Sequence, residues 1–199
     1  YPNRMDNFDG DFIQRHARAV SLFANVTVIH AEPDFQHTMN KKVSSNKDGN
    51  LLEIITYYTV SKRINFLSKI ITGFRYRKTM KRQVEKCIRE NGLPDIVHVH
   101  VPMKAGVIAL WLKKKYAIPF VVTEHWAIYN DEATDKFSNR NFIFKSFTKK
   151  ILQQCSLFLP VSDNLGKAVN DMVTKVAYKP VPNVADADLF FYKTKPGAG

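Results

Sequence analysis

The stretch 95–125, DIVHVHVPMKAGVIALWLKKKYAIPFVVTEH, decides the fold of this chain. Residues 95–100 and 119–123 are rich in β-branched side chains, which predicts two strands, and residues 104–116 between them predict a helix. A strand, a helix and a strand in this order form a βαβ unit, in which the two strands lie parallel in one sheet.

The same alternation continues on both sides of this unit. We expect further helices at residues 11–24, 62–91, 142–154 and 162–175, and further strands at residues 25–30, 51–60, 156–161 and 177–181. Residues 32–50 predict a loop or a small hairpin, and residues 127–140 predict a polar loop. This order predicts an α/β fold with a mostly parallel sheet that helices cover on both faces. Ligands of such sheets bind where the strands end.

Composition limits the class of protein. The chain has 199 residues, of which 45% are hydrophobic and 24% charged, so a disordered or collagen-like chain is excluded. The two cysteines, Cys87 and Cys155, form no CxxC pair, which speaks against a cysteine zinc site and fits a reducing compartment. No run of about 18 apolar residues predicts a transmembrane helix. The sequence also lacks GxGxxG, HExxH, GxSxG and P-loop patterns.

Histidines follow two of the predicted strands. His98 and His100 alternate on one strand and therefore share a face, and His125 comes just after the next strand, between Glu124 and Trp126. A histidine at the carboxyl edge of a sheet can take a proton, bind a phosphate or fix a hydroxyl group. Together with Glu124, the histidines would also suit a metal ion. We expect His98 to be a buried histidine bonded to the backbone, and His125 to be functional.

Gly10 precedes the first predicted helix. A glycine at a helix N-terminus lets backbone N–H groups approach a phosphate, and the helix dipole favours the anion. A plain turn glycine is the simpler local interpretation.

Positive charge concentrates in residues 62–89. This segment holds ten Lys and Arg against a single acid, Glu85, and so carries +9 of the net charge of +12. Because the segment is also amphipathic, it predicts binding to an anionic membrane surface. The basic patch comprises Arg75, Arg77, Lys78, Lys81 and Arg82. A solvated helix face is the alternative, and nucleic acid is not expected, because no aromatic recognition motif accompanies the charge.

Four stretches in order resemble the N-terminal domain of retaining glycosyltransferases with the GT-B fold, of the glycosyltransferase family 4 type. They are YP and GDF at 1–2 and 10–12, DIVHVH at 95–100, PFVVTEHW at 119–126, and VPNVADADLF at 181–190. The resemblance implies a Rossmann-like domain over residues 1–190. Residues 191–199 would then be a linker towards a C-terminal nucleotide-binding domain that this chain lacks. We expect the natural protein to extend beyond both ends, and this chain alone to be inactive.

The resemblance also implies an activity. A sugar would pass from a nucleotide-sugar donor to a glycan or lipid-linked acceptor, with retention of configuration and without a cofactor or metal. His125 would be catalytic and line the cleft, Gly10 would lie near the donor diphosphate, and His100, Glu124 and Trp126 would lie on the acceptor side. The protein would be cytoplasmic, with peripheral attachment to the inner face of the membrane as an option.

Two other functions remain open at this point. A nucleotide-sugar epimerase can share the two-domain architecture, and it would require no acceptor. A basic binding module for anionic lipid or nucleic acid would have no enzymatic activity.

Overall fold

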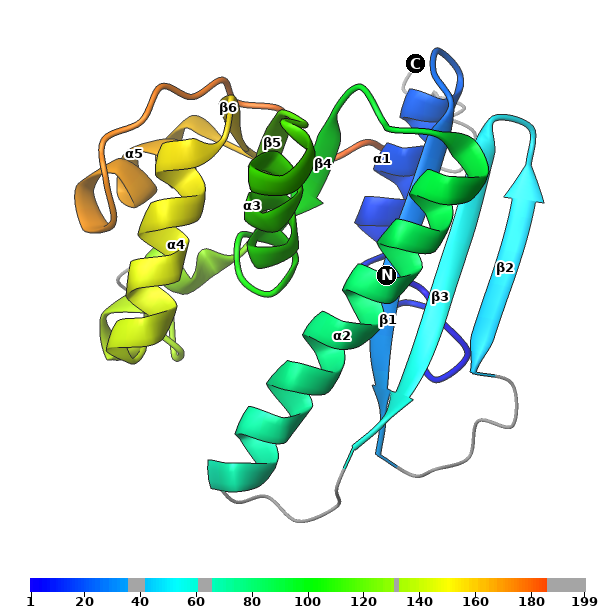
Figure 1. Ribbon diagram of the computed structural model, residues 1–199. Coiled ribbons are helices and arrows are strands. Elements are labelled where there is room, and N and C mark those ends of the chain that lie inside the picture. Colours follow the sequence, from blue (N-terminus) through cyan, green and yellow to red (C-terminus); the bar gives the residue numbers. More distant parts are fainter. Residues whose placement is uncertain (36–41, 61–65, 131–132, 186–199) are drawn as a thin grey trace, which may run out of the picture. The chain divides into compact units, whose positions relative to one another are not determined.

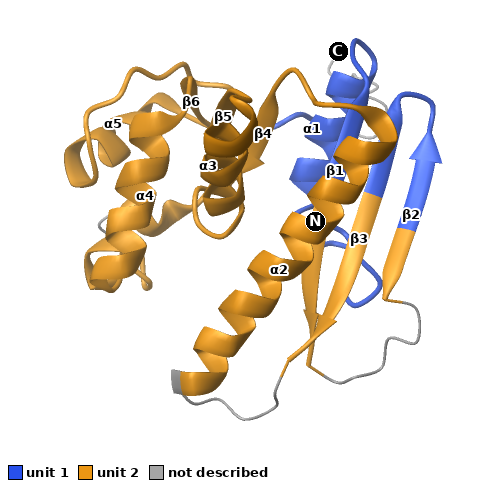
Figure 2. Ribbon diagram, in the orientation of Figure 1, with its two compact units in different colours: residues 1–28, 45–53, 183–199 blue, residues 29–44, 54–182 orange. Residues whose placement is uncertain are grey.

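The computed structural model describes residues 1–35, 42–60, 66–130 and 133–185. The chain divides into two compact units, which Figure 2 shows in different colours. Unit 1 comprises residues 1–28, 45–53 and 183–199, and unit 2 comprises residues 29–44 and 54–182. The predicted linker at 191–199 lies outside the described residues.

A three-stranded parallel sheet organises unit 2. It contains β4 (Val97–His100), β5 (Phe120–Glu124) and β6 (Leu157–Pro160), in this order. Helices α3 (Ala105–Tyr116) and α4 (Phe142–Gln154) connect the strands, and α5 (Asp163–Met172) follows the last of them (Figure 1). Both connections are strand–helix–strand crossovers, so the predicted βαβ arrangement and the α/β fold class are confirmed.

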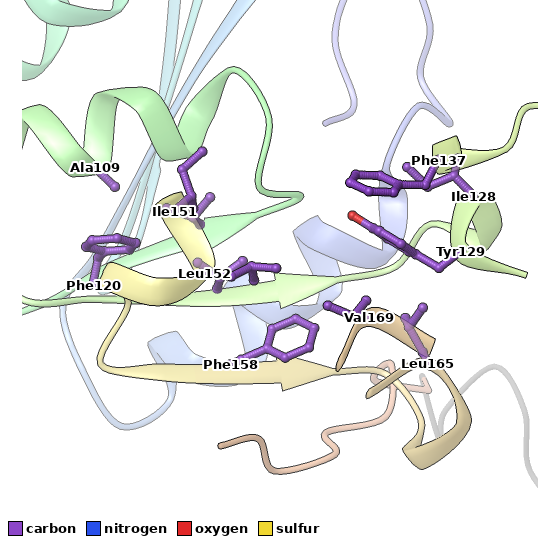
Figure 3. Packing of buried hydrophobic residues seen from close by; sticks show 12 residues of the cluster. Ala109, Phe120, Ile128, Tyr129, Phe137, Ile151, Leu152, Phe158, Leu165 and Val169 are labelled. Atoms are coloured by element: carbon purple, nitrogen blue, oxygen red, sulfur yellow. The ribbon is translucent and has the colours of Figure 1, made fainter. Parts of the chain in front are cut away.

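The core of unit 2 packs against one face of this sheet. Phe120, Val122 and Phe158 are fully buried there, together with Ile151 of α4 and Val169 of α5 (Figure 3). The core residues alternate along β4 and β5 with residues of the other face, as the two-residue period of a strand requires. His98 and His100 therefore lie on the face opposite to Val99, which belongs to the core.

The remaining helix of unit 2 is α2 (Phe66–Asn91). It continues through Gly73 and ends before Gly92, whose φ of 85° is left-handed and favours glycine. Met80 and Val84 of this helix pack with Ile108 and Leu112 of α3 in a second buried cluster. The predicted helix is confirmed from residue 66, and residues 62–65 lie outside the described part of the chain.

The first half of the chain forms a second sheet. Its strands are β1 (Val26–Asp34), β2 (Val43–Asp48) and β3 (Leu51–Thr59), in the order β1-β3-β2. Gly49 and Asn50 separate β2 from β3, which fits the hairpin alternative for this region. Helix α1 (Asp11–Ser21) precedes β1 and lies in unit 1. The described residues thus form two sheets of three strands each.

Two expectations need correction. The predicted strand at 177–181 is reduced to one bridge, between Phe158 and Tyr178. The N–H groups of Lys179 and Val181 donate to Phe158 and Pro160 of β6, but Pro160 itself has no N–H group to continue the ladder. The predicted polar loop at 127–140 contains two short 3-10 turns, η1 (Ala127–Tyr129) and η2 (Phe137–Asn139). Both turns bury aromatic rings.

Candidate active site

The carboxyl ends of β4 and β5 bring two histidines together. His100 ends β4, and the register pairs it with Thr123 of β5, so His125 lies just beyond the same edge. Nδ1 of His100 lies 3.0 Å from Nε2 of His125. The two rings stack with their centroids 5.3 Å apart and their planes 17° apart. Both side chains are half-buried, so neither ring is sealed inside the core.

His98 extends this arrangement. Its ring stacks on His100 with centroids 4.2 Å apart, and its Nε2 lies 2.7 Å from the hydroxyl oxygen of Thr123. His98, His100 and His125 form what we call the histidine row. The expectation that His98 is buried was wrong, because the residue is exposed. Its side chain leaves the sheet on the face opposite to Val99 of the core.

Glu124 lies beneath the turn that carries His125. Its side chain is fully buried, at 0% exposure. Oε1 accepts the backbone N–H groups of His125 and Trp126, each at 2.9 Å, and Oε2 accepts the hydroxyl of Tyr129 at 3.0 Å. Burial raises the pKa of Glu124 to about 7, although the three hydrogen bonds act in the opposite direction. Both carboxylate oxygens therefore point to donors inside the protein, and neither is directed to the histidine row as a metal ligand would be.

Tyr129 is a member of the site that sequence reasoning missed. It is 2% exposed, and the centroid of its ring lies 5.2 Å from that of Phe137. Figure 3 shows the two rings next to each other. Burial and the neighbouring Glu124 raise the pKa of its hydroxyl group. The usable signal was an apolar pair, Ile128 and Tyr129, inside a segment of mainly polar residues.

Trp126 lies on the outer side of the same turn and is 41% exposed. It borders a pocket of about 310 Å³, which is also lined by Ile128, Asp135 and Arg140. The guanidinium group of Arg140 donates a hydrogen bond to Asp135 and lies over the ring of Phe144. An indole ring beside a carboxylate and a guanidinium group suits a ligand with one apolar face and several hydroxyl groups.

Gly10 lies in unit 1, at the N-cap of α1, with a φ of 60°. A Cβ atom at this position would come within 2.7 Å of the backbone nitrogen of Tyr1. Close backbone packing therefore explains a glycine here, and a role in binding phosphate stays a prediction.

The basic patch lies on α2, where Arg75, Arg77, Lys78 and Arg82 are exposed and Lys81 is half-buried. Apolar side chains are exposed on the first half of the same helix: Leu67, Ile70, Ile71 and Phe74. Their spacing of three and four residues places them on one side of the helix. We call these four residues the apolar stripe. Among the described residues, no helix combines the length and the apolar character needed to cross a membrane.

Comparison with known proteins gives the family. The model of Glycosyltransferase Family 4 matches residues 15–189, which include the whole parallel sheet and the histidine row. A search of curated proteins finds no match. The family match covers most of the chain, and the fold agrees with it. The chain therefore belongs to glycosyltransferase family 4, and its function is of the glycosyltransferase type.

Proposed function

We propose that this chain is the acceptor-binding lobe of an enzyme that transfers a sugar from a nucleotide-sugar to a glycan or lipid-linked acceptor, with retention of configuration. The observation that carries the proposal is the pairing of His100 with His125 at the carboxyl edge of the sheet, next to the Trp126 pocket. A C-terminal domain of the same protein would hold the donor nucleotide. The enzyme would need no cofactor or metal.

The roles follow from the chemistry of sugar transfer. A transition state of this kind resembles an oxocarbenium ion. The protein must therefore place the acceptor hydroxyl group and neutralise the leaving diphosphate. In this proposal His125 contacts the reacting sugar and His100 orients the His125 ring. Trp126 stacks against the acceptor, and the backbone at Gly10 lies near the diphosphate.

The experiment replaces His125 by alanine in the full-length protein. Release of nucleoside diphosphate is measured with a panel of nucleotide-sugars and a membrane extract as the source of acceptor. We expect kcat to fall by about 100-fold or more. Lys175→Gln, which breaks an exposed ion pair with Asp171, is the control and keeps full turnover. Unchanged turnover of His125→Ala at saturating substrate would remove His125 from the mechanism.

Two further measurements test the stereochemistry of the transfer and the alternative function as an epimerase. The anomeric configuration of the product, measured by NMR, decides between retention and inversion. Conversion of a nucleotide-sugar into its epimer in the absence of any acceptor would instead identify an epimerase.

The acceptor is proposed to reach the site from a membrane. The apolar stripe and the basic patch share one helix, α2, so the helix offers both apolar side chains and cations to an anionic lipid surface. Each Lys or Arg near an anionic leaflet contributes about 1 kcal/mol. The cytoplasmic face of a membrane is the location that this proposal implies.

Sedimentation with vesicles tests the membrane surface. Wild-type protein should bind phosphatidylcholine vesicles only when they contain phosphatidylglycerol. Changing the basic patch to Glu should abolish this binding. The control changes Lys114 of α3 and Lys149 and Lys150 of α4 to Glu, which alters the net charge and keeps the ion pair between Lys115 of α3 and Glu85 of α2. Full binding by the patch variant would contradict the proposal, and tight binding of an oligonucleotide with a steep salt dependence would favour nucleic acid.

A further inference from the structure

The turn that carries His125 is held in place by the buried carboxylate of Glu124. We call Glu124 and Tyr129, whose hydroxyl group donates to this carboxylate, the anchor. We propose that Glu124 and Tyr129 are positioning residues, which together fix the backbone of His125 and Trp126 and so hold the His125 ring against His100. This inference rests on the proposed role of His125 and adds two residues to it. Neither residue needs to touch a substrate.

The geometry concentrates three donors on one side chain. The two N–H groups that Glu124 accepts belong to consecutive residues, His125 and Trp126, at the point where β5 ends. A carboxylate that binds two consecutive amides restrains the backbone between them, because both N–H groups must point to the same oxygen. The directions in which the side chains of His125 and Trp126 leave the backbone are fixed as a result.

Tyr129 completes the anchor from the other side. Its hydroxyl group donates to the second oxygen of Glu124, so the carboxylate cannot rotate without breaking at least one bond. The tyrosine belongs to η1, which follows Trp126 directly, and its ring is held by Phe137. The anchor therefore joins the end of β5 to the first turn after it.

Full burial makes the anchor sensitive to small changes. Removing one partner leaves polar groups in the interior without a bond, which costs more than the bond itself contributes. A shift of the His125 ring would then follow, and misplacing a reacting group by about 1 Å can reduce turnover about 100-fold. The buried contacts of Glu124 suit a role in orientation, because no acceptor can reach its carboxylate from solvent.

Two single substitutions test the anchor in the full-length protein. Tyr129→Phe removes only the hydroxyl group, and Glu124→Gln replaces one acceptor oxygen by a donor. Each variant should lower kcat by about tenfold or more with little change in the KM for the nucleotide-sugar. The NMR signal of the His125 ring, assigned by its loss in His125→Ala, should shift in both variants. The two substitutions should also be non-additive, since the second one removes a bond that the first has already broken.

Matched controls distinguish a loss of positioning from a general loss of stability. Glu85→Gln removes an exposed ion pair with Lys115, and Tyr178→Phe removes an exposed hydrogen bond to Asp163. Neither control should move kcat or the His125 signal. Melting temperatures of all variants show whether each protein is folded at the assay temperature.

The outcomes are distinct. A lower melting temperature with unchanged kcat and an unmoved His125 signal would overturn the proposal and leave Glu124 as a structural residue. If His125→Ala keeps its turnover, the proposed role of His125 fails, yet the His125 signal in Glu124→Gln still decides whether the anchor positions the ring. Additive effects of the two substitutions would show that Glu124 and Tyr129 act separately, which also contradicts the proposal.

Discussion

Each of the two units contains a buried glutamate with three hydrogen-bond donors, and the two glutamates differ in ionisation. Glu53 in unit 1 is 8% exposed and accepts hydrogen bonds from side chains of Tyr1, Gln14 and Asn46. Glu124 in unit 2 is 0% exposed, and two of its three donors are backbone N–H groups. From the number of hydrogen-bond donors alone, the two glutamates would be expected to have similar pKa values.

The pKa values separate the two residues. Burial acts to raise the pKa of Glu53, but its three hydrogen bonds and the nearby charge of Arg18 outweigh burial and hold the pKa below its ordinary value. Burial dominates at Glu124 and raises its pKa to about 7. The difference teaches that a nearby cation and a little access to water decide whether a buried carboxylate stays ionised.

The largest expected difference is in stability after truncation. Glu124→Ala leaves two backbone N–H groups and one phenol buried without a partner, at a cost of about 1–3 kcal/mol each. Glu53→Ala should cost less, because Gln14 is half-buried and Asn46 is exposed, so both side chains can turn to water. Urea unfolding, followed by the fluorescence of Trp111 and Trp126, measures both losses. Equal losses would show that the two carboxylates are energetically alike.

A smaller difference is expected in the dependence of stability on pH. Because the pKa of Glu124 is raised from 4.5 to about 7, the folded protein binds more protons than the unfolded one between these values. The stability that this group provides is complete below pH 4.5 and is lost as pH rises towards 7. Glu124→Gln should therefore show a smaller loss of stability across this window than the wild type.

Glu53 should behave in the opposite sense. Its lowered pKa provides stability above the ordinary carboxyl value, and this stability is lost as pH falls through the lowered value. Glu53→Gln should reduce the pH dependence of the free energy of unfolding only on the acid side of the ordinary carboxyl pKa. Burial also lowers the pKa of His16, so the comparison uses the difference between variant and wild type at each pH, in which the contribution of His16 cancels. If both variants changed the pH dependence of stability over the same pH range, the opposite pKa shifts of Glu124 and Glu53 would be contradicted.

The smallest expected effects come from the two tyrosines. Tyr129→Phe and Tyr1→Phe each remove one hydroxyl donor from a buried carboxylate, and each should cost about 1 kcal/mol. Both substitutions should also raise the pKa of the partner carboxylate, since a donor to its charged form is lost. Titration by ¹³C NMR of the carboxyl carbons measures the shifts. An unchanged pKa of Glu124 in Tyr129→Phe would show that the hydrogen bond between the two side chains has no electrostatic effect.

Much of unit 2 follows from local sequence patterns. Helix α4 has the bounds that periodicity predicts, and the β-branched runs locate β4 and β5 to within two residues at each end. Because parallel strands end at the same edge, the sequence could also suggest that residues after β4 and β5 come close to each other. The distance between His100 and His125 agrees with that reasoning.

The anchor under His125 could not be predicted in the same way. Residues 127–140 are mainly polar, and their composition predicts a loop, whereas the burial of Tyr129 depends on Phe137, eight residues further along the chain. Nothing local shows that Glu124 turns inwards while His125 faces outwards. The error at residues 177–181 depended on the partner strand, because Pro160 of β6 lacks the N–H group that a further pair would need.

A carboxylate that binds main-chain amides does not select the side chains that those amides carry. Glu124 contacts positions 125 and 126 through their N–H groups alone, and every amino acid except proline supplies such a group. Position 126, which borders the pocket, can therefore be varied in a library that tests its proposed role in acceptor binding, while the N–H group that Glu124 binds is retained. The backbone of this turn thus stays in place whichever side chain position 126 carries.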